Sequence, residues 1–256
     1  GTQTNSRDKF NLFNKVDVKI KFSQSENKFA YSWLEKFGFK HDDKFICLIV
    51  RDDEYLKQNF KYIDWNYHNY RNSDIKNYQD GIRWFISKGY WVIRMGKITD
   101  KKIEIKSDKY LDFSNINDYS DLIDVWLFAN CDGCITTGTG PDIISNIYNR
   151  PCLGVNWLPL IDIHSYQDII TYPKYLYDSN NRLLKINKYL SSSYTKSEDY
   201  IKNKIRIKEL SSTQILNAFK EFYFYKLNKK MLNEKYIKQN DMFWREVLKF
   251  DKFNKF

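Results

Sequence analysis

The sequence contains few cysteine and histidine residues and no long apolar run. Four cysteines and three histidines occur among 256 residues. No apolar stretch reaches the roughly 18 residues that a membrane-spanning helix needs, so we expect no such helix. Four scattered thiols do not form a disulfide framework, and they favour a reducing, cytoplasmic compartment. The chain is long enough to bury a core without disulfide or metal staples.

Two of the cysteines, Cys131 and Cys134, form a C-x-x-C pair. Such a pair is typical of a redox motif or of half a zinc site. No second C-x-x-C and no H-x-x-H follows to complete a set of zinc ligands. Cys134 also begins an apolar run that is typical of a buried strand. We therefore expect no metal site and no redox chemistry at this pair.

Positive charge exceeds negative charge, with 42 Lys and Arg against 32 Asp and Glu and a net charge of +10. A basic chain can bind nucleic acid, anionic lipid or phosphorylated small molecules. The two signs are mixed along most of this chain, which favours a solvated surface and no nucleic-acid partner. The segment 232–256 is basic and amphipathic. It predicts a packing helix, with peripheral contact to an anionic membrane surface as the alternative.

Strand and helix patterns alternate from Phe45 to Trp157. Continuous apolar runs, rich in β-branched residues, predict strands that are buried on both faces of a parallel sheet. The alternation of strands with helices is the signature of a Rossmann-like, doubly wound α/β domain. The expected strands are 45–51, 90–96, 110–113, 134–137 and 152–157, and the expected helices are 25–36, 74–88, 118–130 and 141–149.

We expect three regions along the chain. Residues 1–40 form a helical segment or the remnant of a preceding domain, and residues 41–195 form the Rossmann-like domain. Residues 196–256 form helices, at 211–225 and 233–250, that pack on that domain. The segment 52–70 has no clear period and is predicted to be a long loop, a kind of segment that is often functional.

The strongest functional signal is T-T-G-T-G-P-D, Thr136–Asp142, between a predicted strand and a predicted helix. Ligands of open α/β sheets bind at the carboxyl ends of strands. Gly138 and Gly140 allow close backbone approach, and the hydroxyl groups of Thr137 and Thr139 add donors. The helix that follows favours phosphate at its N-terminus. The motif lacks the Gly-Lys-Ser/Thr of a P-loop and the third glycine of the dinucleotide fingerprint, and a tight turn without a ligand is the alternative.

Arginine residues end two of the predicted strands. Arg51 follows the first buried run and Arg94 ends the second. If these strands are parallel, both side chains reach the edge of the sheet at which the glycine turn lies. Arginine is suited to bidentate contact with phosphate. This convergence predicts an anion-binding site.

Further polar residues flank the predicted loop. His68, Arg71 and Asp74 occur in H-N-Y-R-N-S-D at its end, where histidine could act as a general base that aspartate orients. Local capping of the next helix is the alternative interpretation. At the start of the loop, Asp52 and Asp53 follow the first strand directly. They are candidates for a base or for ion-pair partners of the neighbouring arginine.

Taken in order, the segments L-I-V-R-D-D-E-Y-L, D-W-N-Y-H-N-Y-R-N-S-D-I, G-Y-W-V-I-R-M-G, S-D-L-I-D-V-W-L, T-G-T-G-P-D and P-C-L-G-V-N-W-L-P-L resemble a family of bacterial glycosyltransferases associated with surface-polysaccharide gene clusters. The resemblance covers roughly residues 37–225. It implies the donor-binding, C-terminal half of a GT-B glycosyltransferase, distantly similar to fucosyltransferases with an H-x-R motif after the first strand. Arg51 matches the arginine of that motif, while Ile49 stands where the motif has histidine. The donor sugar is therefore left open.

The resemblance implies transfer of a sugar from a nucleotide sugar to a glycan or glycolipid acceptor. Cationic side chains and a helix N-terminus would stabilise the leaving diphosphate, so no metal is expected. Arg51 would neutralise the diphosphate, with Arg94 as a second anion contact. The expected donor-binding residues are Arg51, Arg71, Asp74, Arg94, Thr137, Gly138, Thr139, Gly140 and Asp142, and the expected catalytic residues are Asp52 and His68.

A GT-B enzyme needs two α/β domains, and the patterns predict one. We therefore expect a fragment that lacks the acceptor domain, located in the cytoplasm or at the inner face of the cytoplasmic membrane. Two other functions stay open. One is a GT-B-like nucleotide-sugar epimerase, which would use carboxylates such as Asp52, Asp53 and Asp142. The other is a basic, non-enzymatic module that binds nucleic acid or anionic glycan.

Overall fold

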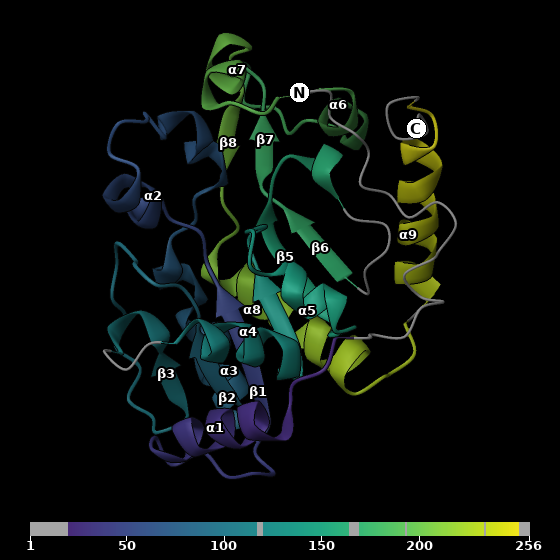
Figure 1. The fold of residues 1–256 in the computed structure, drawn as a ribbon. Coiled ribbons are helices and arrows are strands. Elements are labelled where there is room, and N and C mark those ends of the chain that lie inside the picture. Colours follow the sequence, from purple (N-terminus) through teal and green to yellow (C-terminus); the bar gives the residue numbers. More distant parts are fainter. Residues whose placement is uncertain (1–19, 117–119, 164–168, 193, 233, 251–256) are drawn as a thin grey trace.

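The computed structural model describes residues 20–116, 120–163, 169–192, 194–232 and 234–250. Its centre is a six-stranded sheet with the order β3-β2-β1-β4-β5-β6, in which all neighbouring strands are parallel. The chain extends the sheet from β1 in one direction and, after β4, in the other (Figure 1). This order confirms the predicted Rossmann-like α/β fold. The strands are β1 (Phe45–Ile49), β2 (Trp91–Arg94), β3 (Tyr110–Asp112), β4 (Gly133–Thr136), β5 (Cys152–Trp157) and β6 (Ile169–Pro173).

The first strand illustrates why apolar runs form the centre of the sheet. All five residues of β1 are buried, as expected for a parallel strand that is covered on both faces. Successive side chains of a strand point to opposite faces. Ile46 and Leu48 accordingly belong to one core cluster, and Cys47 and Ile49 belong to another. One continuous apolar run therefore contributes to two cores.

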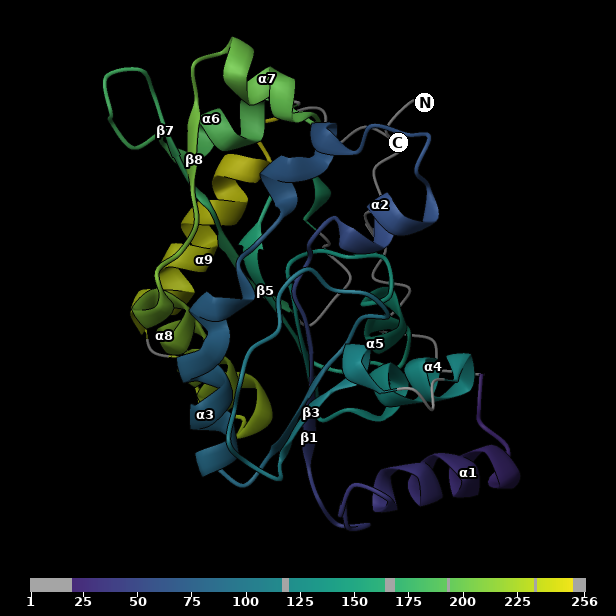
Figure 2. The same cartoon turned by 90° about the vertical axis from the view of Figure 1, so that its left-hand side faces the viewer.

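Helices cover both faces of the sheet, as Figure 2 shows. α3 (Gln79–Ser87) and α8 (Ser212–Phe222) pack on one face, and α1 (Gln24–Glu35) and α4 (Asp121–Asn130) pack on the other, with α5 (Ile143–Ile147) beside α4. This covering on two sides is what buries the central strands. The first nineteen residues of the predicted N-terminal segment 1–40 lie outside the described residues.

Helix α8, which packs beside α3, begins with a reciprocal cap. The side chain of Ser211 accepts the N–H of Gln214, and the side chain of Gln214 accepts the N–H of Ser211. Such a capping box satisfies two of the N–H groups that a helix start leaves unpaired. Ile215, Phe219 and Phe222 then point into the core at helical spacing. Hence the pattern at 211–225 predicts α8 correctly.

A third core lies at the carboxyl end of β5. Its buried residues include Tyr70, Trp157 and Val247. The pairing of β7 with β8 crosses position 195/196, where the sequence predicts a boundary. The elements that surround this core are β7 (Tyr175–Tyr177), β8 (Arg206–Lys208), α6 (Ile186–Ser191), α7 (Ser197–Lys202) and α9 (Glu234–Val247).

Two segments without a clear sequence period contain regular structure. The predicted loop 52–70 includes α2 (Glu54–Asn59) and most of a 3-10 helix, η2 (Asn66–Arg71). The edge strand β6 is also absent from the predicted elements. Its residues are only partly buried, and an edge strand therefore needs a weaker apolar signal than a central one. A prediction based on apolar period therefore misses short or half-buried elements.

The C-terminal helix α9 turns part of its surface inward. Phe243, Trp244 and Val247 contact the third core, as the predicted packing helix requires. The structure gives no support to the alternative of membrane contact through this helix. Within the described ranges, every helix is too short or too polar to cross a bilayer.

Gly81 on α3 is a position at which one added methyl group should destabilise the fold. A Cβ atom there would lie 2.4 Å from Cδ2 of Phe219 on α8, and Phe219 is fully buried. We expect Gly81→Ala to lower the free energy of unfolding by about 1–3 kcal/mol through overpacking. Urea denaturation measures the change. Gly140→Ala, whose Cβ would meet open space, should change stability by less than about 0.5 kcal/mol, and equal effects of both variants would contradict this packing.

Candidate functional site

The candidate site lies between β1 and β4, where the strand order of the sheet reverses. In open α/β sheets, ligands bind in the crevice at the carboxyl ends of such strands. The N–H of Arg51 donates to Oγ1 of Thr137 at 2.8 Å, and the N–H of Thr137 donates to the main-chain oxygen of Ile49 at 3.3 Å. The pairing of β1 with β4 thereby places Arg51 directly beside the glycine turn.

The glycine turn is held by its own side chains. The hydroxyl of Thr136 accepts the N–H of Gly138 at 2.9 Å and donates to the carboxylate of Asp142 at 2.5 Å. The same carboxylate accepts the N–H of Thr139 at 2.9 Å. Gly138 has a φ of 79°, which favours glycine. The main-chain N–H groups of Gly138 and Thr139, two of the predicted donor-binding residues, are therefore engaged inside the turn, and one carboxylate oxygen of Asp142 accepts two of the hydrogen bonds that shape it.

Thr139 and Gly140 form the open side of the turn. Oγ1 of Thr139 is buried and has no hydrogen-bond partner within the described residues. Both residues line a cavity of about 320 Å³, which also reaches Arg51 and Asp52. Much of the remaining lining is apolar and comes from Ile49, Leu56, Met95, Ile98, Phe128 and Pro141.

Two arginine side chains converge on this turn. Arg71, at the end of η2, donates from Nη2 to the main-chain oxygen of Gly138. Burial lowers the pKa of Arg51, and the neighbouring charge of Arg71 lowers it further. Nε of each arginine is buried without a hydrogen-bond partner, and no carboxylate of the described residues forms an ion pair with either side chain. Positive charge without an ion-pair partner in a partly desolvated crevice favours an anion.

The imidazole of His68 lies against the same two charges. Its ring centroid is 4.0 Å from that of Tyr67, and its Nδ1 is buried without a partner among the described residues. Burial, with the charges of Arg51 and Arg71, lowers the pKa of His68 to about 4. The imidazole is therefore neutral near pH 7, and one of its ring nitrogens can accept a proton.

Arg94 lies at the same edge of the sheet but its charge is already compensated. Its Nη1 is 3.0 Å from the carboxylate of Asp112 and donates to the main-chain oxygen of Lys101 at 2.7 Å. Arg94 and Asp112 face each other in the β2–β3 pairing, and Arg94 is only 1% exposed. The guanidinium links β2 to β3 and to the chain at Lys101, and this geometry does not favour the predicted second anion contact.

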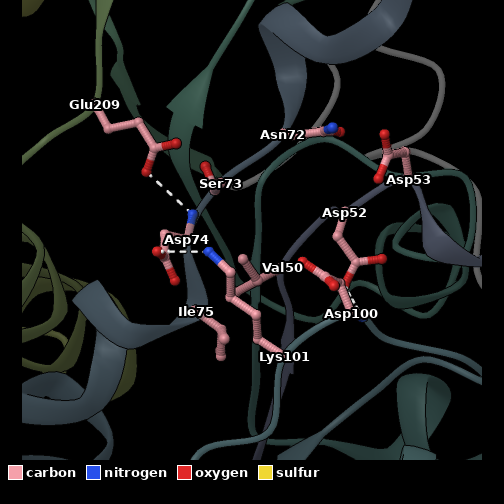
Figure 3. A pocket seen from close by; sticks show the side chains of 10 residues that line it. All are labelled: Val50, Asp52, Asp53, Asn72, Ser73, Asp74, Ile75, Asp100, Lys101 and Glu209. Carbon is pink, nitrogen blue, oxygen red and sulfur yellow. Dashed lines mark hydrogen bonds and ion pairs between the residues drawn. The ribbon is translucent and has the colours of Figure 1, made fainter. Parts of the chain in front are cut away.

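A second cavity, of about 330 Å³, shares Val50 and Asp52 with the first (Figure 3). Asp52 accepts the N–H groups of Glu54 and Asp100, each at 3.1 Å, and burial raises its pKa. Asp74 is engaged by Lys101, with 2.9 Å between carboxylate and ammonium. The sequence groups Asp74 with His68 and Arg71, whereas the structure places Asp74 in this second cavity. Its lining consists of Val50, Asp52, Asp53, Asn72, Ser73, Asp74, Ile75, Asp100, Lys101 and Glu209.

Lys174 and Glu209 are two residues at the site that the sequence pattern does not predict. Lys174 is only 2% exposed and donates to the main-chain oxygen of Asn72. These two residues are 102 positions apart, so no local pattern links them. One signal was present in the sequence. Lys174 is a single charge within the apolar and aromatic run I-I-T-Y-P-K-Y-L-Y.

All four cysteines are free and buried. Cys47, Cys134 and Cys152 lie in register on β1, β4 and β5 and belong to one core cluster. Among the residues that the structure describes, no group of three or more His, Cys, Asp or Glu side chains is placed to hold a metal ion. In the described structure the thiols pack in the core.

Comparison with known proteins gives a likeness of fold. No protein-family model and no curated protein matches the chain. One similar solved structure is the E. coli ADP-heptose LPS heptosyltransferase II, with a TM-score of 0.42 and 14% sequence identity. The match covers 59% of this chain and 44% of that chain. This chain thus spans less than half of that protein.

The titration of His68 should report an anion in the site. We expect a pKa of about 4 in the free protein and a higher pKa with sulfate, because a nearby negative charge stabilises the imidazolium. By linkage, sulfate should bind more tightly as the pH falls through that higher value toward about 4, the pKa of His68 in the free protein. NMR of the ring signals, assigned with His68→Gln, measures both effects. A pKa that saturating sulfate leaves unchanged would contradict an anion site beside His68.

Proposed function

We propose that the protein is the nucleotide-sugar-binding part of a glycosyltransferase, which transfers a sugar to a glycan or glycolipid acceptor. One observation carries this proposal. The guanidinium groups of Arg51 and Arg71 meet at the Gly138 turn and have no carboxylate partner within the described ranges. A diphosphate suits such a pair, because arginine can bind phosphate oxygens through two parallel hydrogen bonds.

The two cavities beside this pair suit the other parts of a nucleotide sugar. The cavity of about 320 Å³ offers apolar side chains such as Met95 and Phe128 to a flat nucleobase. The cavity of about 330 Å³ offers carboxylate oxygens that accept hydrogen bonds from sugar hydroxyl groups. Asp52 lines both cavities. A donor whose diphosphate lies on Arg51 would therefore reach into both.

The proposed reaction breaks the bond between the anomeric carbon of the sugar and the diphosphate. Negative charge grows on the leaving oxygen, and Arg51 and Arg71 stabilise it electrostatically. The proposal therefore needs no metal ion. The acceptor hydroxyl loses a proton as it attacks, and Asp52 and the neutral imidazole of His68 are the proposed proton acceptors. Oγ1 of Thr139 is a further donor toward the diphosphate.

Arg51→Met and Arg71→Met should each weaken the binding of a nucleoside diphosphate. Methionine retains a long, uncharged side chain and removes a charge-assisted hydrogen bond worth about 1.5–3 kcal/mol. The affinity should therefore fall about tenfold or more. Thermal unfolding with UDP, GDP and ADP identifies the nucleotide, because a ligand at about 100 times its Kd adds about 2.7 kcal/mol of stability. Calorimetry then compares the variants.

The matched control for both variants is Arg83→Met, which removes an exposed arginine that pairs with Asp80 on α3. It should bind the selected nucleotide as the unchanged protein does. The proposal is wrong if neither nucleoside diphosphates nor pyrophosphate stabilise the protein. It is also wrong if Arg51→Met and Arg71→Met bind as tightly as Arg83→Met.

The carboxylates of the second cavity favour a second candidate, a nucleotide-sugar epimerase. Asp52 and Asp53 line this cavity, and epimerisation needs an acid and a base at the sugar. Incubation of the bound nucleotide sugar without an acceptor separates the two functions. Without an acceptor, the proposed transferase should leave the bound nucleotide sugar unchanged. Chromatographic detection of an epimer would instead favour the second candidate.

A further inference from the structure

An ion pair between a buried lysine and a half-buried glutamate contacts the chain immediately after Arg71. Lys174 lies between β6 and β7, is 2% exposed, and donates from Nζ to the main-chain oxygen of Asn72. Its Nζ is 3.7 Å from the carboxylate of Glu209, which follows β8. The other carboxylate oxygen of Glu209 accepts the N–H of Asp74 at 3.2 Å (Figure 3). The pair therefore contacts both ends of the short segment 72–74.

The middle of that segment is bonded to the first arginine of the site. The N–H of Ser73 donates to the main-chain oxygen of Arg51 at 2.9 Å. The main chain of three successive residues is thus hydrogen-bonded, in turn to the side chain of Lys174, the main chain of Arg51 and the side chain of Glu209. Arg71 directly precedes this segment, and its guanidinium reaches the Gly138 turn. A shift of the segment would move Arg71 relative to Arg51.

The burial of Lys174 gives this ion pair a desolvation cost. Removal of an ammonium group from water disfavours its charged form. Burial accordingly lowers the pKa of Lys174 to about 8, while the carboxylate of Glu209 acts to raise it. Buried ion pairs contribute little net stability in general. The contacts of Lys174 and Glu209 instead converge on one segment of the candidate site.

We propose that Lys174 and Glu209 are positioning residues for the anion site. They hold the segment 72–74 so that the guanidinium of Arg71 stays beside Arg51 and the glycine turn. Neither residue needs to touch the ligand. The inference rests on the proposed function for the identity of the ligand, a diphosphate, while the placement of Arg71 is tested without any ligand.

The chain offers a matched control for a lysine of this kind. Lys109 also donates to a main-chain oxygen, that of Gly89 at 3.0 Å, and lies 3.3 Å from the carboxylate of Asp43. These contacts lie at the opposite, amino edge of the sheet, before β2 and β3. Lys109→Met therefore removes the same type of interaction at a distance from the site.

The test compares Lys174→Met and Glu209→Gln with Lys109→Met. Pyrophosphate affinity, measured by calorimetry, should fall about tenfold in Lys174→Met. This corresponds to a loss of about 1.4 kcal/mol of binding free energy when Arg71 is misplaced. Glu209→Gln keeps an acceptor for the N–H of Asp74 and should show a smaller loss of affinity. It also keeps the test decisive if Lys174→Met does not fold. Lys109→Met should bind pyrophosphate as the unchanged protein does.

The pKa of His68 gives a second readout. It should stay unchanged if Lys174 and Glu209 only stabilise the fold and do not position Arg71. Arg71 is one of the charges that lower this pKa. NMR titration without ligand should therefore show a higher pKa of His68 in Lys174→Met and Glu209→Gln, and no change in Lys109→Met. An unchanged pKa in both site variants would overturn the proposal.

The two proposals fail in different ways. If the unchanged protein does not bind pyrophosphate, the proposed function is wrong, and the titration of His68 still decides whether Lys174 and Glu209 position Arg71. If pyrophosphate binds, and both site variants bind it as tightly as Lys109→Met, the positioning role is wrong and the anion site stands.

Discussion

The parallel pairing of β1 with β4 is the constraint on which the candidate site depends. It makes these two strands neighbours although 83 residues lie between the end of β1 and the start of β4, so the chain after β1 meets the chain after β4. A hydrogen bond from the N–H of Arg51 to the hydroxyl of Thr137 records that meeting. The strand order reverses at the same point, which leaves a crevice between loops that depart in opposite directions. The other residues of the site are arranged around this junction.

Charge compensation separates the three arginines near this edge. Arg94 forms an ion pair with Asp112 across β2 and β3, so its charge serves the sheet. Arg51 and Arg71 have no such partner among the described residues, and burial together with their charges lowers the pKa of Arg51 and of His68. Like charges in a half-buried crevice repel each other. This arrangement is destabilising by itself, and the anion of the proposed function would compensate it.

The third core anchors the segment that leads to Arg71. Tyr70, directly before Arg71, is buried in it, and its N–H donates to the hydroxyl of Ser197 at 3.2 Å. Lys174 and Glu209 hold the chain on the other side of Arg71. One half of the site therefore comes from the sheet and the other half from a segment anchored in a separate core. The position of one half relative to the other depends on how that core packs.

The sequence by itself determined the alternation of strands and helices, the burial of the F-I-C-L-I strand on both faces and the glycine turn at the end of β4, because apolar period and glycine spacing are local properties. It also placed Arg51 correctly, since the residue after a buried strand must lie at the edge of the sheet. Only the tertiary structure decided that Arg94 has a carboxylate partner and that Asp142 is occupied within the turn. It alone brought Lys174 to Asn72 across 102 residues. The physical reason is that a sequence pattern encodes whether a side chain is buried, whereas the partner that compensates its charge is chosen by packing between distant segments.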